Sequence, residues 1–281
     1  MNGSLLQLKL KYAAKKYQFL VTETLKAYIS KTPKRNILFS LKPEWEKPIK
    51  KGFVFTGHKL TFASFDKNKI ADYDLIVPLT IEDVMLMHEL GHNLNSNQIP
   101  IPSLECIQLC DDKFIFSKKM HSLGFGEYIP EIGDNLAYPF FLKKKIDTWG
   151  ANTFLIENDA QFQAKLNSIE QDQFFCQTCV KGQVEYGTHI LFMDNKIVFT
   201  LTIEKTFAGE TSIHGKDPHI AGIVDCPFLA LFADMLSALN YQGLCCLNFK
   251  IIDGKPYIFE INPRFGGSLS LYFFSVLRHL N

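Results

Sequence analysis

The feature that most constrains the fold of this chain is a β-hairpin predicted near its C-terminus, in the stretch GLCCLNFKIIDGKPYIFEINPRFGGS (243–268). An Asp-Gly pair in the middle of the stretch is typical of a hairpin turn between two alternating strands. A three-residue loop, Asp253–Lys255, places Phe249 opposite Phe259 and gathers six apolar side chains on one face. A two-residue loop would pair Asn248 with Phe259 and mix the two faces. The alternation therefore favours the three-residue loop.

The other face of this hairpin carries three oxygen-bearing side chains, Asn248, Glu260 and Asn262. Oxygen ligands suit a hard cation such as Mg²⁺ (or Mn²⁺), which also binds the phosphate oxygens of a nucleotide. Arg264 follows closely, and a guanidinium group clamps phosphate or carboxylate groups. Two glycines and Ser268 then allow backbone amides to approach an anion. The stretch predicts a metal and phosphate site, and the alternative is a polar, solvated hairpin face.

The remaining sequence alternates strand-like and helix-like patterns. Leu and Tyr recur every three or four positions over 5–31, which indicates a helix. Apolar runs predict strands at 36–41, 52–57, 74–79, 137–145 and 152–158. Further helices are predicted at 81–95, after the N-cap Thr80, and at 111–125, 159–171 and 226–240. This order predicts an α/β unit followed by α+β subdomains that flank a cleft.

Composition and charge limit the classes of protein that the chain can belong to. The 281 residues carry a formal net charge of +1, so no overall field favours nucleic acid or an anionic membrane. The seven cysteines are scattered and odd in number, which favours reduced thiols over a disulfide framework. The N-terminal stretch lacks the apolar core of a signal peptide, and no apolar run is long enough to span a bilayer. We therefore expect a cytoplasmic protein with no nucleic-acid or membrane partner.

A second motif, MHELGHNL, has the H-E-x-x-H spacing of a zinc protease. On a helix, His88 and His92 would share one face and bind Zn²⁺, with Glu89 as general base. The continuation lacks a metzincin third ligand, because Asn95 and Gln98 stand at its glycine and histidine positions. Helical periodicity instead predicts two partly buried, hydrogen-bonded histidines in an N-terminal domain. A zinc protease is the weaker of the two interpretations.

Four motifs together resemble the ATP-grasp superfamily, most closely its carbamoyl-phosphate synthetase and biotin carboxylase branch. EINPRFGGS resembles the C-terminal metal motif of that family. YPFFLK resembles its strand with an ATP-contacting lysine, here Lys143, and DDK resembles a helix start with a second phosphate-contacting lysine, here Lys113. FCQTCVKGQVEY resembles the hinge between the two ATP-grasp subdomains. The resemblance covers about 105–281 well, and 36–104 is similar more loosely to the domain that precedes such modules.

The resemblance implies an α/β (α+β ATP-grasp) fold with a defined domain order. A short Rossmann-like N-terminal domain, 1–104, would precede an ATP-grasp domain, 105–281. Within the second domain, subdomains 105–176 and 177–281 would enclose a nucleotide cleft. The chemistry would then be carried by side chains from both subdomains.

The resemblance also assigns roles within that cleft, residue by residue. The nucleotide would be bound by hinge groups and two lysines, namely Gln177, Cys179, Val180, Glu185, Lys113 and Lys143. The metal would be held by Glu260 and Asn262, with Asn248. Two further cations would act on the reacting groups: Arg264 on the transferring phosphoryl group or the acyl phosphate, and Lys205 as a second cationic contact.

The chemistry of that family is the activation of a carboxylate by ATP as an acyl phosphate, which an amine then attacks. The resemblance thus implies an ATP-dependent carboxylate–amine ligase acting on small molecules, and it allows a homodimer. The alternatives are a carboxylase or carbamate-phosphorylating enzyme of the same fold, and a nucleotide-binding pseudoenzyme. Two departures keep the pseudoenzyme open: Asn248 stands where many members have a carboxylate, and the loop KKIDTWGAN has a single glycine, Gly150.

Overall fold

The computed structural model describes residues 3–29, 33–68, 70–91, 99–147, 150–211, 213 and 220–280. The strands are β1 (Asn36–Phe39), β2 (Lys59–Phe62), β3 (Leu75–Val77), β4 (Phe140–Lys144), β5 (Thr153–Ile156), β6 (Phe174–Thr178), β7 (Val184–Met193), β8 (Lys196–Thr206), β9 (Ile220–Val224), β10 (Gly243–Ile252) and β11 (Lys255–Asn262). The helices are α1 (Gly3–Ile29), α2 (Pro43–Gly52), α3 (Ile81–Leu90), α4 (Leu104–Asp111), α5 (Lys113–Ser122), α6 (Asp159–Leu166) and α7 (Leu229–Ala238). Short 3₁₀ turns lie at Ile70–Asp72, Gly126–Tyr128, Gln171–Gln173, Gly267–Leu269, Phe273–Ser275 and Leu277–His279.

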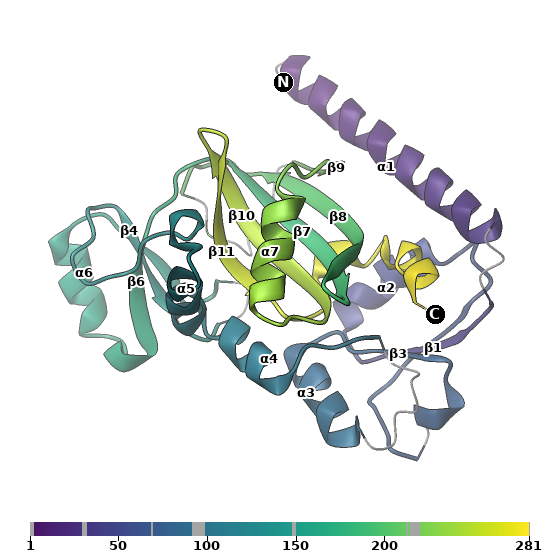
Figure 1. Cartoon of the computed structure of the whole chain (residues 1–281). Helices are drawn as coiled ribbons and strands as arrows, with labels where there is room; N and C mark the ends of the chain where they lie inside the picture. Colours follow the sequence, from purple (N-terminus) through teal and green to yellow (C-terminus); the bar gives the residue numbers. More distant parts are fainter. Residues whose placement is uncertain are drawn as a thin grey trace.

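These strands form three sheets among the described residues (Figure 1). The first has the order β2-β1-β3 and is parallel. The second has the order β5-β4-β6, and the third the order β11-β10-β7-β8-β9; both are antiparallel. The change from parallel to antiparallel pairing along the chain agrees with the predicted order of an α/β unit before α+β subdomains.

The first sheet contains the strands predicted at 36–41 and 74–79, and it is followed by the predicted helix. α3 starts at the N-cap Thr80, whose hydroxyl accepts a hydrogen bond from the Asp83 backbone N–H over 3.2 Å. The Asp83 carboxylate accepts one in return from the Thr80 backbone N–H over 2.9 Å. This reciprocal cap satisfies two backbone donors at the helix start and confirms the predicted N-cap.

The strand predicted at 52–57 is wrong. These residues end α2 and form the turns after it, and the strand lies later, in β2. Trp45, Ile49 and Phe53 are spaced four residues apart and are all buried, which is the periodicity of a helix and its first residue beyond. The apolar run that suggested a strand is largely at the surface, where Phe55 is 85% exposed.

Helix α1 lies along the outer edge of the molecule and packs on β9 (Figure 1). Tyr12 rests on Gly222, where even a Cβ atom would lie 2.1 Å from the Tyr12 ring. The Tyr12 hydroxyl donates a hydrogen bond to the Glu204 carboxylate, and the ring of Phe19 meets that of Tyr272 edge-on at 5.5 Å. These contacts fix one face of α1 against the body of the protein.

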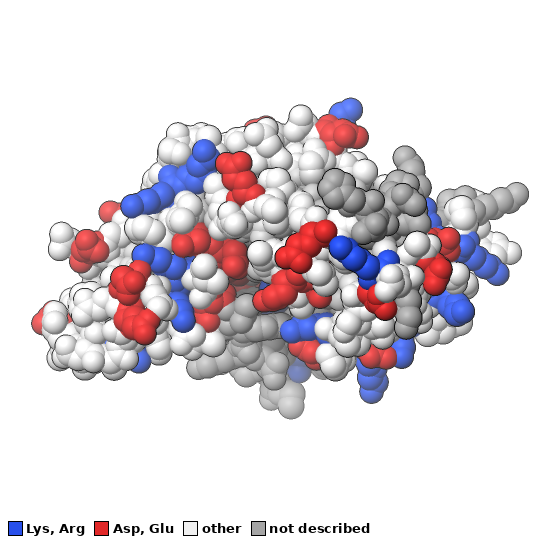
Figure 2. Space-filling model, turned by 90° about the horizontal axis from the view of Figure 1, so that it is seen from below, with Lys and Arg blue, Asp and Glu red and all other residues white. Residues whose placement is uncertain are grey.

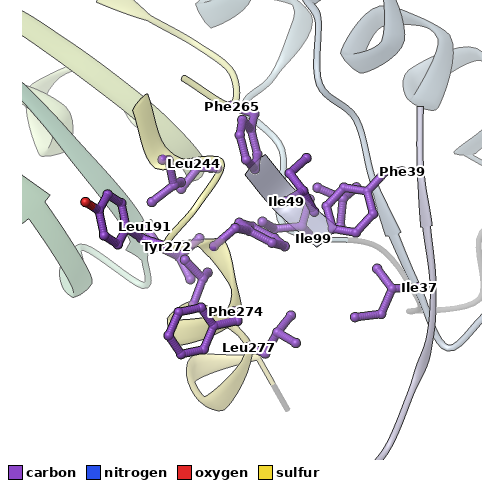
Figure 3. Close-up of a cluster of buried hydrophobic side chains, with 14 of the residues drawn as sticks. Ile37, Phe39, Ile49, Ile99, Leu191, Leu244, Phe265, Tyr272, Phe274 and Leu277 are labelled. Carbon is purple, nitrogen blue, oxygen red and sulfur yellow. The ribbon is translucent and has the colours of Figure 1, made fainter. Parts of the chain in front are cut away.

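The third sheet is covered on both faces, so its strands are buried in the centre of the molecule. On one face it packs against α4, α5 and α7. On the other face it shares a hydrophobic cluster with the first sheet and with the turns that follow β11. Figure 3 shows this cluster, with Leu191 and Leu244 of the central sheet on one side and Phe39 of β1 on the other. The two ends of the chain therefore meet on one face of the central sheet.

The C-terminal hairpin has the expected register where the polar residues lie. Asn248 pairs with Glu260, and Cys246 pairs with Asn262. The pairing places these polar side chains on one face of the sheet, as the sequence predicted. The register argument is thus confirmed for the half of the hairpin that carries the candidate metal ligands.

Near the turn the expected register is wrong. A β-bulge shifts the pairing, so Phe249 pairs with Ile258 and the loop has two residues, Asp253 and Gly254. Both have positive φ, 51° and 77°, as a tight two-residue hairpin turn requires. Phe259 is the additional residue at the bulge. Alternation analysis assumes one register throughout a strand, so it cannot detect such an insertion.

Candidate active site

A cavity of about 360 Å³ lies between the two antiparallel sheets, with walls from β4 and β6 on one side and from β7, β8, β10 and β11 on the other. Ten of the eleven residues predicted from the sequence line it: Lys113, Lys143, Gln177, Val180, Glu185, Lys205, Asn248, Glu260, Asn262 and Arg264. The eleventh, Cys179, is not among the lining residues, although its neighbours Thr178 and Val180 are.

Lys143 extends from β4 towards the hinge strand β6. Its Nζ donates a hydrogen bond to Gln177 Oε1 over 3.0 Å and lies 5.9 Å from the centre of the Phe259 ring. Burial is the main cause that lowers the pKa of Lys143 to about 8; the Glu260 carboxylate opposes this shift, and the charge of Lys113 adds to it. A phosphate placed beside this ammonium group would stabilise its charged form.

Lys113 is the first residue of α5, where the Asp112 side chain caps the helix by accepting two backbone N–H bonds of 2.9 Å. The Lys113 Nζ donates to the Asp147 carbonyl oxygen over 2.7 Å and lies 3.6 Å from Glu260 Oε2. The Asp147 carboxylate in turn accepts from the Asn152 backbone N–H over 2.9 Å. The described part of the glycine-poor loop is therefore tied to the first lysine.

Two carboxamide side chains contact one carboxylate in the cavity wall. The Nδ2 groups of Asn248 and Asn262 both donate to Glu260 Oε1, over 2.7 and 3.0 Å. Gly187 lies opposite on β7, where a Cβ atom would come within 3.3 Å of Asn248 Oδ1. One carboxylate and two carboxamides form a set of oxygen ligands, which fits a hard cation of the Mg²⁺ type rather than a zinc ion.

The side of the cavity formed by β6 holds a buried amide group, one of whose polar atoms has no hydrogen-bond partner among the described residues. Gln177 is 2% exposed, and its Nε2 has no hydrogen-bond partner among the described residues. Nearby, the Lys250 Nζ donates to the carbonyl oxygens of Val180 and Glu210, over 3.1 and 3.0 Å. Burial lowers the pKa of Lys250. These bonds tie the hinge to the central sheet.

A further part of the cavity wall is cationic. Lys205 and Arg264 both line it, and neither has an ion-pair partner within the part of the chain that is described. His189 Nε2 lies 2.7 Å from Ser268 Oγ. Burial, with the charges of Lys205 and Arg264, lowers the pKa of His189 to about 3, so its imidazole is neutral. This part of the cavity favours an anion.

Lys250, His189 and Trp45 are among the lining residues that the sequence analysis missed. Lys250 lies two residues beyond Asn248 on β10, and His189 lies four beyond Glu185 on β7. A period of two along each strand was therefore an available signal. Trp45 belongs to α2, in a segment interpreted without a helix, and its ring lies 5.9 Å from the Arg264 guanidinium carbon.

His88 and Glu89, from the H-E-x-x-H motif, do not line this cavity. His88 is half-buried on α3, and its Nε2 lies 2.7 Å from the Pro102 carbonyl oxygen. This confirms the predicted hydrogen-bonded histidine at that position. His92 falls outside the described residues, so the second half of the motif cannot be placed.

No family sequence model matches the chain, and no curated protein matches it in sequence. Solved structures match it in fold. The phosphoribosylamine–glycine ligase of Thermotoga maritima is 16% identical, over 88% of this chain and 72% of its own, with a TM-score of 0.62. The L-amino acid ligase of Bacillus licheniformis is 13% identical, over 87% and 71%, with a TM-score of 0.61. The biotin carboxylase of Campylobacter jejuni, in complex with β,γ-ATP, is 13% identical, over 93% and 68%, with a TM-score of 0.59.

These matches cover 87–93% of this chain. At identities of 13–16% they establish how the chain is arranged rather than what it acts on. The fold implied by the four sequence motifs is thereby confirmed. The protein has the ATP-grasp fold.

Proposed function

We propose that the protein is an ATP-dependent ligase that activates a small-molecule carboxylate as an acyl phosphate for attack by an amine. The observation that carries this proposal is the convergence of Lys113, Lys143 and the oxygen cluster at Glu260 in one cleft. Two cations suited to phosphates and one site suited to a hard cation then face the same space. This combination suits a nucleoside triphosphate better than any other common ligand.

The nucleotide would lie along the cavity with its base at the hinge. Gln177 offers an open Nε2 donor there, and the backbone around Cys179 and Val180 would complete the adenine contacts. Glu185 would face the ribose. Lys113 and Lys143 would hold the phosphates, and their charges would offset the negative charge of the triphosphate.

Glu260, Asn262 and Asn248 would hold Mg²⁺ (or Mn²⁺). When bound, the metal would neutralise phosphate charge and help to align the transferring group. Because Glu260 is the sole carboxylate of the three, it would supply most of the protein's negative charge at the metal. Its present hydrogen bonds from both carboxamides keep the three side chains together.

The part of the cavity lined by Lys205 and Arg264 would bind the substrate carboxylate. A carboxylate oxygen attacks the γ-phosphorus, ADP leaves, and the resulting acyl phosphate carries charge that Arg264 and Lys205 would stabilise. The amine then attacks the carbonyl carbon, phosphate leaves, and the nitrogen loses a proton. The neutral His189 keeps Ser268 in place beside Arg264 without adding a further positive charge.

The compartment and domain division complete the proposal. All seven cysteines are free thiols, which suits the reducing cytoplasm. No helix among the described residues is long and apolar enough to cross a membrane. We assign 1–104 to an N-terminal domain and 105–281 to the ATP-grasp domain, with subdomains at 105–176 and 177–281. The proline-containing segment before α4 would be the link between the two domains.

Two other activities of the same fold remain as candidates. A carboxylase that phosphorylates bicarbonate or carbamate would use the same lysines and metal ligands. A nucleotide-binding pseudoenzyme is favoured by Asn248, which replaces a potential second carboxylate, and by the single glycine of the loop near Gly150. The three activities differ in what ADP release requires.

The deciding experiment is ADP release from Mg·ATP, screened over amino acids, dipeptides and small acids. A ligase releases ADP only when both an acid and an amine are present. Release with bicarbonate alone would identify a carboxylase instead, and nucleotide binding without release under any condition would identify a pseudoenzyme. Lys143→Ala should abolish turnover, whereas Lys144→Ala, its neighbour on β4 outside the cavity lining, should retain it.

A further inference from the structure

Helix α1 has two apolar faces, and only one of them packs against the rest of the described chain. The packed face carries Tyr12 and Phe19. The other face, which we call the outer stripe, is Leu6, Leu10, Ala13, Ala14, Tyr17, Val21, Leu25 and Tyr28. Its six large side chains are 55–85% exposed. Such a run of exposed large apolar side chains along one helix marks an interaction surface.

The spacing of the outer stripe keeps it straight. Leu6, Tyr17 and Tyr28 are eleven residues apart, and so are Leu10 and Val21. Because three turns of an α-helix contain about 11 residues, positions with this spacing drift little around the axis. A left-handed coiled coil instead requires a seven-residue repeat. A straight stripe along the edge of the molecule suits a flat partner (Figure 1).

The charges on α1 indicate the sign of that partner. The helix carries five lysines and one glutamate, a net +4, so the rest of the chain carries a net −3. At about 100° per residue, Lys9 and Lys16 border one edge of the outer stripe, and Lys11 borders the other. Lys15 lies further round the helix and forms an ion pair with Asp225, with Nζ 3.6 Å from Oδ2. Figure 2 shows that acidic and basic side chains are interspersed on another face of the molecule. Positive charge is thus concentrated on this helix.

The placement of these lysines does not stabilise the helix itself. They lie in its N-terminal half, whose first turn has no acidic residue, although the helix dipole favours negative charge there. The one acidic residue of the helix, Glu23, is 5% exposed and is ion-paired with Lys26 and Arg278. Lys9, Lys11 and Lys16 have no ion-pair partner within the described ranges, so an external anion is what they fit.

We propose that α1 docks the protein on an anionic lipid surface. The outer stripe enters the apolar boundary of the bilayer, while lysines on both of its edges reach the phosphate headgroups. A second copy of the chain is a poorer occupant. Parallel helices would set lysine against lysine, and antiparallel helices would offer no exposed acid, because Glu23 is buried. The net charge of +1 does not reveal the positive charge of α1, because it is the sum of that charge and the negative charge of the rest of the chain.

The proposal is independent of the nucleotide site and is tested by vesicle flotation of the full chain. Vesicles of phosphatidylglycerol and phosphatidylcholine should carry the protein upward, and vesicles of phosphatidylcholine alone should not. Leu10→Glu with Val21→Glu should abolish flotation. The matched control is Val54→Glu with Phe55→Glu, which changes two apolar residues that are 64% and 85% exposed elsewhere. This control should float like the unmodified protein.

A second pair of variants tests the charge. Lys9→Gln with Lys16→Gln should lower the partition coefficient about fivefold for each lysine removed. Lys118→Gln with Lys119→Gln, a pair of exposed lysines on α5, should leave it unchanged. Circular dichroism and the melting temperature establish that each variant is folded.

Two results would overturn the proposal. One is the absence of flotation with anionic vesicles for the folded, unmodified protein. The other is flotation that the Leu10 and Val21 variant retains. Light scattering adds a third reading: a dimer that the same variant converts to monomer, without lipid binding, would assign the outer stripe to a second copy of the chain.

Discussion

Lys113 and Glu260 face each other in the candidate nucleotide cleft, with Nζ 3.6 Å from Oε2. The lysine comes from the start of α5 and the glutamate from β11, so a helix terminus and the C-terminal hairpin meet there. Both partners have a proposed role with a nucleotide, since one would bind phosphate and the other a metal. Nucleotide and metal would therefore replace a direct ion pair by two separate contacts.

The first prediction concerns the charge at the proposed metal site. Glu260→Gln is nearly isosteric and retains the strand pairing, so the protein should fold. It removes the one carboxylate of the cluster, and turnover should fall on the order of 100-fold or more while nucleotide affinity falls less. Steady-state kinetics over a range of Mg²⁺ concentrations measures both effects.

Asn248→Asp is the complementary change at the same site. It adds a second carboxylate opposite Glu260, so half-maximal activity should require less Mg²⁺. Full ATP-dependent activity in Glu260→Gln, or an unchanged Mg²⁺ requirement in Asn248→Asp, would contradict the metal assignment.

The second prediction follows from the lowered pKa of Lys143, about 8, against an ordinary value of 10.5. In the free protein the charged ammonium is disfavoured, so it loses its proton as the pH rises through 8. A bound triphosphate favours the charged form, and binding above pH 8 must therefore take up a proton. The dissociation constant for nucleotide should rise by up to about tenfold per pH unit above that point.

Isothermal titration calorimetry in buffers of different ionisation enthalpy measures this proton uptake directly. Lys143→Arg is the control, because a guanidinium group remains charged throughout this range. Its affinity should stay nearly constant between about pH 7.5 and 9.5 if it binds. A constant affinity and no proton uptake in the unmodified protein would show that Lys143 does not contact the phosphates.

The third prediction is that the H-E-x-x-H motif has no catalytic role. His88→Ala with His92→Ala should leave ATP turnover within a few-fold of the unmodified protein, because His88 is bonded to the Pro102 carbonyl outside the cavity. Metal analysis of the purified protein accompanies the kinetics. Stoichiometric zinc that is lost together with activity in the variant would restore the protease interpretation.

The fourth prediction concerns two glycines with positive φ. Gly243 has φ of 98°, and a Cβ atom there would lie 2.2 Å from the Pro100 carbonyl oxygen. Gly243→Ala combines backbone strain with a steric clash and should lower the free energy of unfolding by about 3 kcal/mol. Gly254→Ala has φ of 77° but open space, so it should cost about 1 kcal/mol. Urea denaturation measures both, and equal losses would contradict the steric argument.

The hairpin illustrates how far the sequence alone can lead. Alternation correctly paired Asn248 with Glu260, since polar and apolar side chains separate cleanly there. It failed near Phe259, because a bulge changes the pairing without a change in composition. Ten of the eleven proposed site residues line one cavity, yet Cys179 does not. Its proposed contact with the nucleotide is through backbone groups, which leave no side-chain pattern in the sequence from which its position could be predicted.

Helix α2 was not predicted from the sequence, and the pattern around it shows why. The apolar run near Phe55 favours a strand by composition, whereas Trp45, Ile49 and Phe53 follow a helical period just before it. Because no helix was predicted there, Trp45 was not among the predicted site residues. Its proximity to Arg264 arises from the packing of distant segments, which the pattern of one segment does not encode.

The hydrophobic cluster that β1 and the last turns share with the central sheet limits which parts of the chain can be transferred to another protein during evolution. Residues of β1 and of the last turns pack on the same face of the central sheet that lines the cavity, beside the cavity. A deletion of the first hundred residues would leave Leu191, Leu201 and Leu244 facing water, and the cleft would lose its support. Recombination that transfers the part with the cavity alone would therefore not give a working unit, because residues near both ends of the chain are also required.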